Sequence, residues 1–499
     1  MATIDPSYSV KAMPARLGIE ASASCPEAEQ SRPGPASQLR RERHRLFRQI
    51  DQEALEAAAS LGEGMDAARR ALFGLGVRSA PLFFGFALFI AEQSRVDRVS
   101  RLCFFTREGE LFHQVFERVF PEGRFAGLEL PPAEILEVSR LATFSASLGS
   151  LSLKEMMRLW TLYSSQSIFA LGKSLGIEPE QLGLSCARHG IALAEDIIRP
   201  WEDDRVARLF ADADFKRIVI DKIERDRQAA ALYFERRGVA TAGDTVGIVD
   251  IGWRGTIQDN IALMLPQTRF VGYYMGLQRF LNVQPPNCLK KAFGPNANRD
   301  LLFSHLLDAV SPMEMLCNSP HGSVMGYRTD GNGDAVAIRL TEASETAIYT
   351  DTVRHFQDGV LFALPFWSAR MEPAGLRSAE LREMACGIWT SLITKPDRQI
   401  SEAYAALNHN DVFGVGCFVD KKVVPSPIKL LRSLVFSRDR RDVILYIKQT
   451  QWTSGLWHRR DLAVLHKAVL VAALSTGRAY KRTRMWMQHH WKHKGQIGE

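Results

Sequence analysis

The residues best suited to chemistry lie in the stretch Asp244–Gln258, where Asp250 is followed by Gly252, Arg254 and Gly255. A guanidinium group between small residues that let the backbone approach a ligand is suited to grip an anion. A carboxylate beside it can orient a hydroxyl group or accept its proton. The pattern therefore predicts a site for a phosphorylated ligand. The alternative is a tight turn in which Asp250 caps the backbone or pairs with Arg254, and the glycines serve only packing.

A buried strand and an amphipathic helix are expected to position these residues. The β-branched run from Val246 to Ile251 is typical of a strand covered on both faces. After the glycines, Ile257, Ile261, Met264 and Leu265 recur at helical spacing. The start of this helix would aim free N–H groups and its positive end at the anion, with Thr256 and Gln258 nearby.

A second strand–turn–helix unit repeats this design earlier in the chain. Leu102–Phe105 is the predicted strand, Thr106–Gly109 the turn and Glu110–Phe120 the helix. Ligands collect beyond the carboxyl ends of parallel strands. If the two strands are neighbours, Arg107 and Arg254 would converge at that edge, and Arg140 would supply a third cation.

These units predict an α/β protein with a Rossmann-like parallel sheet and added helices, because a further strand, Arg269–Met275, follows the helix as in a βαβ crossover. Gly74, Gly76 and Pro81 predict a break before an apolar helix, Leu82–Ile90. The expected regions are a disordered leader (1–38), an α/β core (39–330) with a helical insertion near 151–237, a mainly helical extension (331–422) and a basic tail (423–499).

The candidate catalytic residues are the carboxylates Asp250 and Glu108. Alternatives stay open for the neighbouring groups: Arg107 and Glu108 could form a structural ion pair, and Trp253 could be a core residue or a platform for a sugar ring. The candidate substrate-binding residues are Arg107, Gly109, Arg140, Gly252, Trp253, Arg254, Gly255, Thr256 and Gln258.

Other polar residues are expected to be structural. Ser311 followed by Glu314 fits a helix capping box. His113 lies beside a stripe of Phe residues and His321 in a Pro-His-Gly turn, and neither has a partner at metal-ligand spacing. The sequence predicts no metal site and identifies no cofactor.

The positive charge is concentrated at the end of the chain, because residues 421–499 carry 17 Lys and Arg against 4 Asp and Glu. Within this tail, residues 478–494 interleave cations with Trp486 and Trp491. That mixture suits an anionic membrane surface. Single-stranded nucleic acid is a less favoured partner, and a solvated tail without a ligand is the remaining alternative.

Composition and cysteine usage favour a cytoplasmic protein, with peripheral contact at the inner face of a membrane. The apolar share of 46% and charged share of 24% are ordinary for a soluble protein. The seven cysteines are scattered without a CxxC pair, which favours reduced thiols. No signal peptide is expected in the leader, and the apolar stretches Ala80–Ala91 and Leu462–Leu474 fall short of the ~20 residues of a membrane span.

Several ordered motifs over residues 75–330 resemble one family. They are Ala80-Pro-Leu-Phe-Phe-Gly-Phe, Leu102-Cys-Phe-Phe-Thr-Arg-Glu-Gly, Val138-Ser-Arg, Val249-Asp-Ile-Gly-Trp-Arg-Gly-Thr-Ile-Gln, Val271-Gly-Tyr-Tyr-Met-Gly-Leu and Ser311-Pro-Met-Glu-Met-Leu. The succession resembles the C-terminal region of predicted haloacid-dehalogenase-superfamily hydrolases encoded among bacterial genes for capsule, lipopolysaccharide and other surface glycans.

The resemblance implies a context in surface-polysaccharide assembly, but two departures limit what it implies about chemistry. The family turn reads Arg-Asp-Gly, whereas this chain has Glu108 between Arg107 and Gly109. The hydrolase signature Asp-x-Asp is absent, since Asp250 is followed by Ile251 and Gly252. We therefore expect an enzyme that binds a sugar phosphate or nucleotide sugar, with glycosyl or phosphoryl transfer favoured over hydrolysis. The alternative is a non-catalytic phospho-glycan-binding partner of a separate hydrolase or transferase at the membrane.

Overall fold

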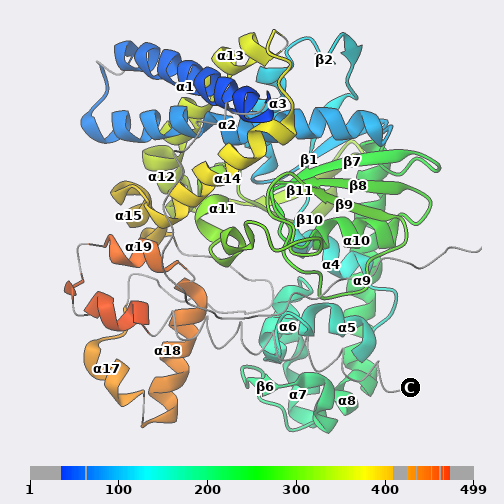
Figure 1. Ribbon diagram of the computed structural model, residues 1–499. Helices are drawn as coiled ribbons and strands as arrows, with labels where there is room; N and C mark the ends of the chain where they lie inside the picture. The colour runs from blue at the N-terminus through cyan, green and yellow to red at the C-terminus, as the bar shows by residue number, and fades with distance from the viewer. Residues whose placement is uncertain are drawn as a thin grey trace, which may run out of the picture. The chain divides into compact units, whose positions relative to one another are not determined.

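The computed structural model describes residues 35–61, 64–371, 373–407, 424–433, 435–450, 452–459, 462–464 and 466–472 (Figure 1). The chain divides into two units, Met1–Gln49 and Ile50–Glu499. Helix α1 (Pro35–Leu61) contributes residues to both. Residues 1–34 of the expected leader and the basic segment 478–494 lie outside the described residues. The second unit contains the central sheet.

The centre of this unit is a five-stranded sheet of parallel strands in the order β4-β1-β7-β8-β9. Numbered along the chain, this order is 2-1-3-4-5, one of the two common orders of doubly wound sheets. The prediction of an α/β protein with a Rossmann-like parallel sheet is confirmed. The strands are β1 (Arg101–Phe105), β4 (Ala133–Leu136), β7 (Thr245–Asp250), β8 (Arg269–Tyr274) and β9 (Cys288–Ala292).

Helices cover both faces of the sheet. On one face, Cys103 and Ile248 belong to a buried core with residues of α9 (Ala213–Arg236) and α10 (Thr256–Met264). On the other, the ring of Phe104 lies 5.6 Å from that of Phe116 in α3 (Gly109–Val119). Side chains alternate between the faces of a strand, so strands covered on both sides are apolar throughout. This is the pattern that predicted β1 and β7.

Helix α2 (Ala67–Val96) runs unbroken through Gly74, Gly76 and Pro81, so the predicted break is wrong. Gly76 serves close packing: a Cβ atom there would lie 2.0 Å from the carbonyl oxygen of Phe356 in α13 (Arg354–Met371). Among the described helices, α2 is the one long and apolar enough to cross a membrane, but 78% of its most apolar window is buried inside the protein.

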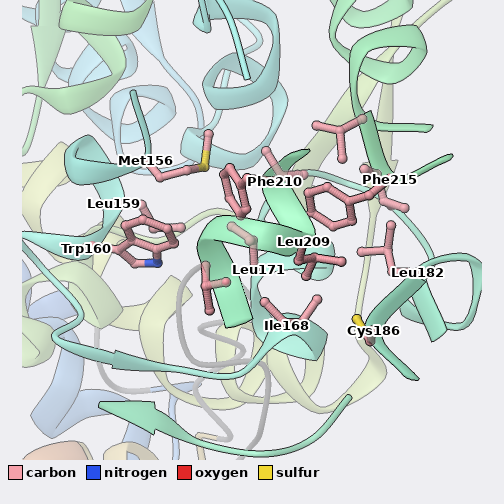
Figure 2. Packing of buried hydrophobic residues seen from close by; sticks show 14 of the residues in the cluster. Met156, Leu159, Trp160, Ile168, Leu171, Leu182, Cys186, Leu209, Phe210 and Phe215 are labelled. Carbon is pink, nitrogen blue, oxygen red and sulfur yellow. The ribbon is translucent and has the colours of Figure 1, made fainter. Parts of the chain in front are cut away.

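The insertion near residues 151–237 is mainly helical, as predicted, and has a core of its own in which Trp160, Phe210 and Phe215 are buried (Figure 2). Asp212 separates α8 from α9. The other elements here are α5 (Leu153–Trp160), β5 (Ser165–Gln166), α6 (Ile168–Ser174), η3 (Pro179–Leu182), α7 (Gly183–Arg188), β6 (Ile197–Ile198), η4 (Pro200–Glu202) and α8 (Asp204–Ala211).

After the sheet, β10 (Ser323–Thr329) and β11 (Ala335–Leu340) form an antiparallel hairpin, and mainly helices follow. Pro365 lies inside α13. The remaining described elements are β2 (Arg124–Phe125), β3 (Leu128–Glu129), α4 (Arg140–Phe144), η2 (Ser145–Ser147), η5 (Ser304–Asp308), α11 (Ser311–Cys317), α12 (Ala343–Ile348), η6 (Tyr349–Val353), α14 (Ser378–Thr394), α15 (Arg398–Ala406), α17 (Pro427–Arg432), α18 (Ser437–Thr450) and α19 (Thr453–Trp457).

Candidate functional site

The carboxyl ends of β1 and β7 lie side by side, since Phe104 pairs with Val249 in parallel register. The sheet order reverses between these two strands: β1 leads to β4 on one side and β7 leads to β8 on the other. Such a switch point is where open α/β sheets bind ligands. The two predicted turns, after Phe105 and after Asp250, therefore meet at the edge that this topology favours for a site.

Asp250 is the most deeply buried acid at this edge, with 5% of its surface exposed. Burial, and then the negative charge of Glu108, raises the pKa of its carboxyl well above the usual value, and Glu314 adds to this while Arg140 opposes it. Its Oδ1 accepts a hydrogen bond of 2.8 Å from the N–H of Ile251. Asp250 thus caps the turn, as the structural alternative held, and also lies among charged groups.

Glu108 is the second carboxyl of this group. Burial raises its pKa, Arg107 lowers it, and Glu314 raises it further. Arg107 donates through Nη1 to Oε2 of Glu345 in α12, at 3.1 Å. Burial disfavours the charged form of Arg107, but Glu108, Glu345 and Glu314 together raise its pKa. Arg107 is therefore held among carboxylates, as a structural ion pair would be.

Arg254 and Arg140 form the cationic part of the edge. Burial, and then the positive charge of Arg140, lowers the pKa of Arg254, whereas Tyr163 opposes this shift. The Nε of Arg254 is buried, and none of the described residues accepts a hydrogen bond from it. Arg140 also lies close enough to Asp250 to lower its pKa. The positive charge that lowers the pKa of Arg254 is thus that of Arg140, whereas the charged groups around Arg107 are carboxylates.

Two of the predicted binding residues, Gln258 and Trp253, form hydrogen bonds within the protein. Gln258 is completely buried; its Nε2 donates to the carbonyl groups of Phe270 and Leu289, and its Oε1 accepts from the hydroxyl of Tyr274. The amide of Gln258 is therefore satisfied within the protein. It locks α10 onto β8 and β9.

The indole of Trp253 packs in the core, with its ring centroid 5.6 Å from that of Trp389. Its Nε1 donates to Oε1 of Glu314 at 2.7 Å. Trp253 therefore packs as a core residue, which is one of the two roles expected for it. The predicted capping box is wrong, because the side chain of Ser311 does not cap α11 and Glu314 binds the indole.

The predicted glycines make close approaches possible. Gly252 has a φ of +137°, and a Cβ atom there would lie 2.3 Å from the carbonyl oxygen of Gly276. At Gly255, with a φ of +63°, a Cβ atom would lie 2.6 Å from the hydroxyl oxygen of Tyr274. Gly109, the first residue of α3, is close to the backbone of Phe104. These glycines allow tight packing against protein atoms at the turns.

Lys290 was not predicted at this edge, although it lies beside the start of α10. Its Nζ is 2.6 Å from Oδ1 of Asp259 and donates to the carbonyl oxygen of Arg254 at 2.9 Å. Burial lowers the pKa of Lys290 and raises that of Asp259, and the attraction between the two opposes both shifts. Thr256, the first residue of α10, is partly exposed. Lys290 fixes the backbone at the position from which Arg254 extends.

None of these residues lines the cavity of about 350 Å³ that lies elsewhere in the protein. It is lined by Glu110, His113, Gln114, Ile135, Glu137, Arg237, His321 and Arg339. Sequence reasoning treated His113 and His321 as structural and singled out none of the others as site residues. The available signals were the polar residues directly after β1 and β4 and the Pro-His-Gly turn, but only tertiary structure joins them.

No group of three or more His, Cys, Asp or Glu within the described residues is arranged to hold a metal ion. The five cysteines in this part of the chain are free thiols. Neither a scan against protein-family models nor a search of curated proteins finds a match to this chain.

Proposed function

We propose that this protein binds the phosphate of a sugar phosphate or nucleotide sugar at the edge between β1 and β7, and transfers its glycosyl or phosphoryl group. Arg254 and Arg140 bind phosphate oxygens, and Asp250 orients a hydroxyl group or accepts its proton. Glu108 is the second candidate acid–base group. Arg107, which is engaged by Glu345, keeps Glu108 in place.

The observation that carries this proposal is the pairing of Arg254 with Arg140. The positive charges of Arg254 and Arg140 repel one another, and the burial of Arg254 adds to the free-energy cost of keeping it charged. A phosphate dianion relieves both effects, because guanidinium groups bind its oxygens with charge-assisted, often bidentate hydrogen bonds. The buried Nε of Arg254 offers a donor that no described residue uses.

The carboxyl groups support acid–base chemistry beside that phosphate. Burial raises the pKa of both neighbouring carboxyls, Asp250 and Glu108, and the charge of Glu108 raises that of Asp250 further. Enzymes use such pairs to accept a proton from a nucleophile and to give one to a leaving group. Transfer of a sugar or phosphoryl group to a hydroxyl group requires the first of these steps.

The biological setting we propose comes from the family resemblance of residues 75–330. It is the assembly of bacterial surface polysaccharides, in the cytoplasm or at the inner face of the membrane. Contact with anionic lipids is assigned to residues 478–494, which lie outside the described residues. No nucleic acid partner is proposed.

Thermal stabilisation by a panel of sugar phosphates and nucleotide sugars tests ligand binding, since a specific ligand raises the unfolding temperature by mass action. With the ligand found, Asp250→Asn should abolish turnover and leave binding. Arg254→Gln should abolish binding. If the natural protein binds the ligand without turning it over, Asp250→Asn changes binding little and Arg254→Gln abolishes it, the protein is the non-catalytic binding partner. If no member of the panel stabilises the protein, the proposed site is wrong.

A further inference from the structure

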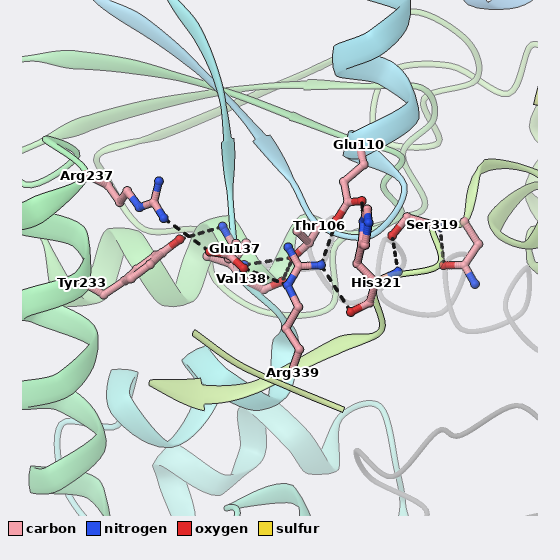
Figure 3. A network of polar contacts seen from close by, with 10 residues as sticks. Thr106, Glu110, Glu137, Val138, Tyr233, Arg237, Ser319, His321 and Arg339 are labelled. Atoms are coloured by element: carbon pink, nitrogen blue, oxygen red, sulfur yellow. Dashed lines mark hydrogen bonds and ion pairs between the residues drawn. The ribbon is translucent and has the colours of Figure 1, made fainter. Parts of the chain in front are cut away.

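A chain of ion pairs crosses the wall of the cavity beside edge strand β4, and it joins residues from five separate segments (Figure 3). Nδ1 of His321 lies 2.5 Å from Oε2 of Glu110, and Oε1 of Glu110 lies 3.0 Å from Nη1 of Arg339. Arg339 reaches Glu137 through Nε at 2.8 Å, and Nη2 of Arg237 lies 3.4 Å from the other oxygen of Glu137.

Glu110 and His321 form the part of this chain that can do chemistry. The Glu110 side chain is 9% exposed and that of His321 is 64% exposed, so a buried carboxylate holds a solvent-facing imidazole. In the neutral ring, donation from Nδ1–H to Glu110 leaves Nε2 with its lone pair, and no described residue bonds to it. A base oriented by a carboxylate is the arrangement that activates hydroxyl groups in many enzymes.

The fold determines where His321 lies. The turn that carries it contains Gly322, whose φ is +73°, and a Cβ atom there would lie 2.1 Å from the carbonyl oxygen of Leu340 in β11. Glu110 occupies the first turn of α3, where a carboxylate is favoured by the helix dipole. Arg339 binds both Glu110 and Glu137, which fixes the carboxylate that orients the imidazole.

Arg237 is the cation of the cavity lining that can still donate hydrogen bonds to a ligand. Its side chain is 42% exposed, and its contact with Glu137 is the longest of the chain. Its guanidinium carbon lies 5.3 Å from the ring centre of Tyr233, so the aromatic ring supports the group and leaves N–H donors for a ligand. A phosphate matches those donors.

We propose that this cavity is a second ligand site, for a small phosphate monoester with a free hydroxyl group. Arg237 binds the phosphate, and Nε2 of His321 accepts a hydrogen bond from the hydroxyl group. Glu110 holds the imidazole in the tautomer whose Nε2 can accept this hydrogen bond. A cavity of about 350 Å³ is large enough for such a molecule. The site does not depend on the function assigned to the β1–β7 edge.

Labelling by diethyl pyrocarbonate, located by mass spectrometry, tests ligand binding on the full chain. Millimolar glycerol 2-phosphate should slow the labelling of His321 several-fold. It should not slow that of His189, whose Nε2 lies 3.1 Å from Asp212 in the helical insertion. Arg237→Gln should remove the protection, whereas Arg199→Gln, an exposed arginine paired with Glu202, should keep it. Protection that persists in Arg237→Gln, or equal protection of both histidines, would overturn the proposal.

Two further results separate this site from the β1–β7 edge and test the base directly. Arg254→Gln should leave the protection of His321 intact even if it abolishes nucleotide-sugar binding. In nitrogen-15 spectra, neutral His321 should carry its proton on Nδ1. A neutral ring protonated on Nε2 would contradict the role of Glu110, and loss of protection in Arg254→Gln would place the phosphate at the other site.

Discussion

Asp250, at the end of β7, lies so close to Glu108, just beyond β1, that the charge of Glu108 adds to burial in raising the pKa of the Asp250 carboxyl. The two residues are far apart in the sequence and meet because β1 and β7 are neighbours. Parallel pairing of the two strand–turn–helix units brings these two carboxyl groups together. It has measurable consequences for stability and for chemistry.

Asp250→Asn should flatten the dependence of stability on pH. A carboxyl whose pKa is raised by folding binds its proton more tightly in the folded protein. The free energy of unfolding therefore falls as the pH rises from the ordinary value of 3.8 to the raised pKa. Each pKa unit corresponds to about 1.4 kcal/mol. Urea unfolding across this range should show a smaller loss for the variant, and parallel curves would contradict the burial and charge described here.

Asp212→Asn should have the opposite pH dependence. A backbone hydrogen bond from Phe215, and further bonds from Arg188 and His189, lower the pKa of Asp212. The stability that it contributes is thus present above the ordinary value of 3.8 and lost as the pH falls through the lowered pKa. The variant should be less stable than the natural protein at neutral pH, and the two should converge in acid. A constant difference at every pH would argue against a role for the charge.

Gly76→Ala should destabilise the protein, whereas Gly74→Ala in the same helix should not. A Cβ atom at Gly76 would lie 2.0 Å from the backbone of α13, but at Gly74 the nearest atom is the end of the Arg78 side chain, at 3.7 Å. Overpacking of this kind costs about 1–3 kcal/mol or more. Replacing an open helical glycine by alanine gains up to about 1 kcal/mol. Thermal unfolding of the pair measures the difference, and equal stabilities would show that α2 and α13 are not in contact at Gly76.

Lys290→Met should cost about 3–5 kcal/mol, since it leaves Asp259 without its buried partner. The double variant Lys290→Met, Asp259→Asn should recover much of this loss, because no uncompensated charge is then buried. A double-mutant cycle in denaturant gives the coupling energy. A coupling close to zero would mean that the pair does not hold the backbone at Arg254.

The parts of the fold that sequence predicted are those with strong local patterns. β1 is apolar from Leu102 to Phe105 and β7 from Val246 to Val249, and a turn that contains glycine leads from each strand to a helix. β9 escaped prediction because Lys290 and Lys291 interrupt its apolar pattern at the edge of the sheet. β4 is another edge strand, short and placed after two prolines. In α2, glycines that mediate helix packing look the same in sequence as glycines that end a helix.

The candidate site was predicted only in outline. The positions of Asp250 and Glu108 follow from the strand ends, but the engagement of Arg107 by Glu345 depends on α12, far away in the chain. Trp253 and Gln258 are the types of residue that bind sugars, yet their polar atoms bind Glu314 and the backbone of β8 and β9. The cavity beside β4 takes residues from five segments, and nothing local in the sequence relates Glu110 to His321 or Arg339.

Isothermal titration calorimetry with a stabilising nucleotide sugar or sugar phosphate tests most directly the claim that Arg254 and Arg140 bind a phosphate at the β1–β7 edge. Arg254→Gln and Arg140→Gln should each weaken binding at least tenfold, a loss of about 1.4 kcal/mol. Arg188→Gln, which removes an exposed arginine of the helical insertion, should leave the affinity unchanged. Unaltered affinity in both Arg254→Gln and Arg140→Gln would contradict the claim.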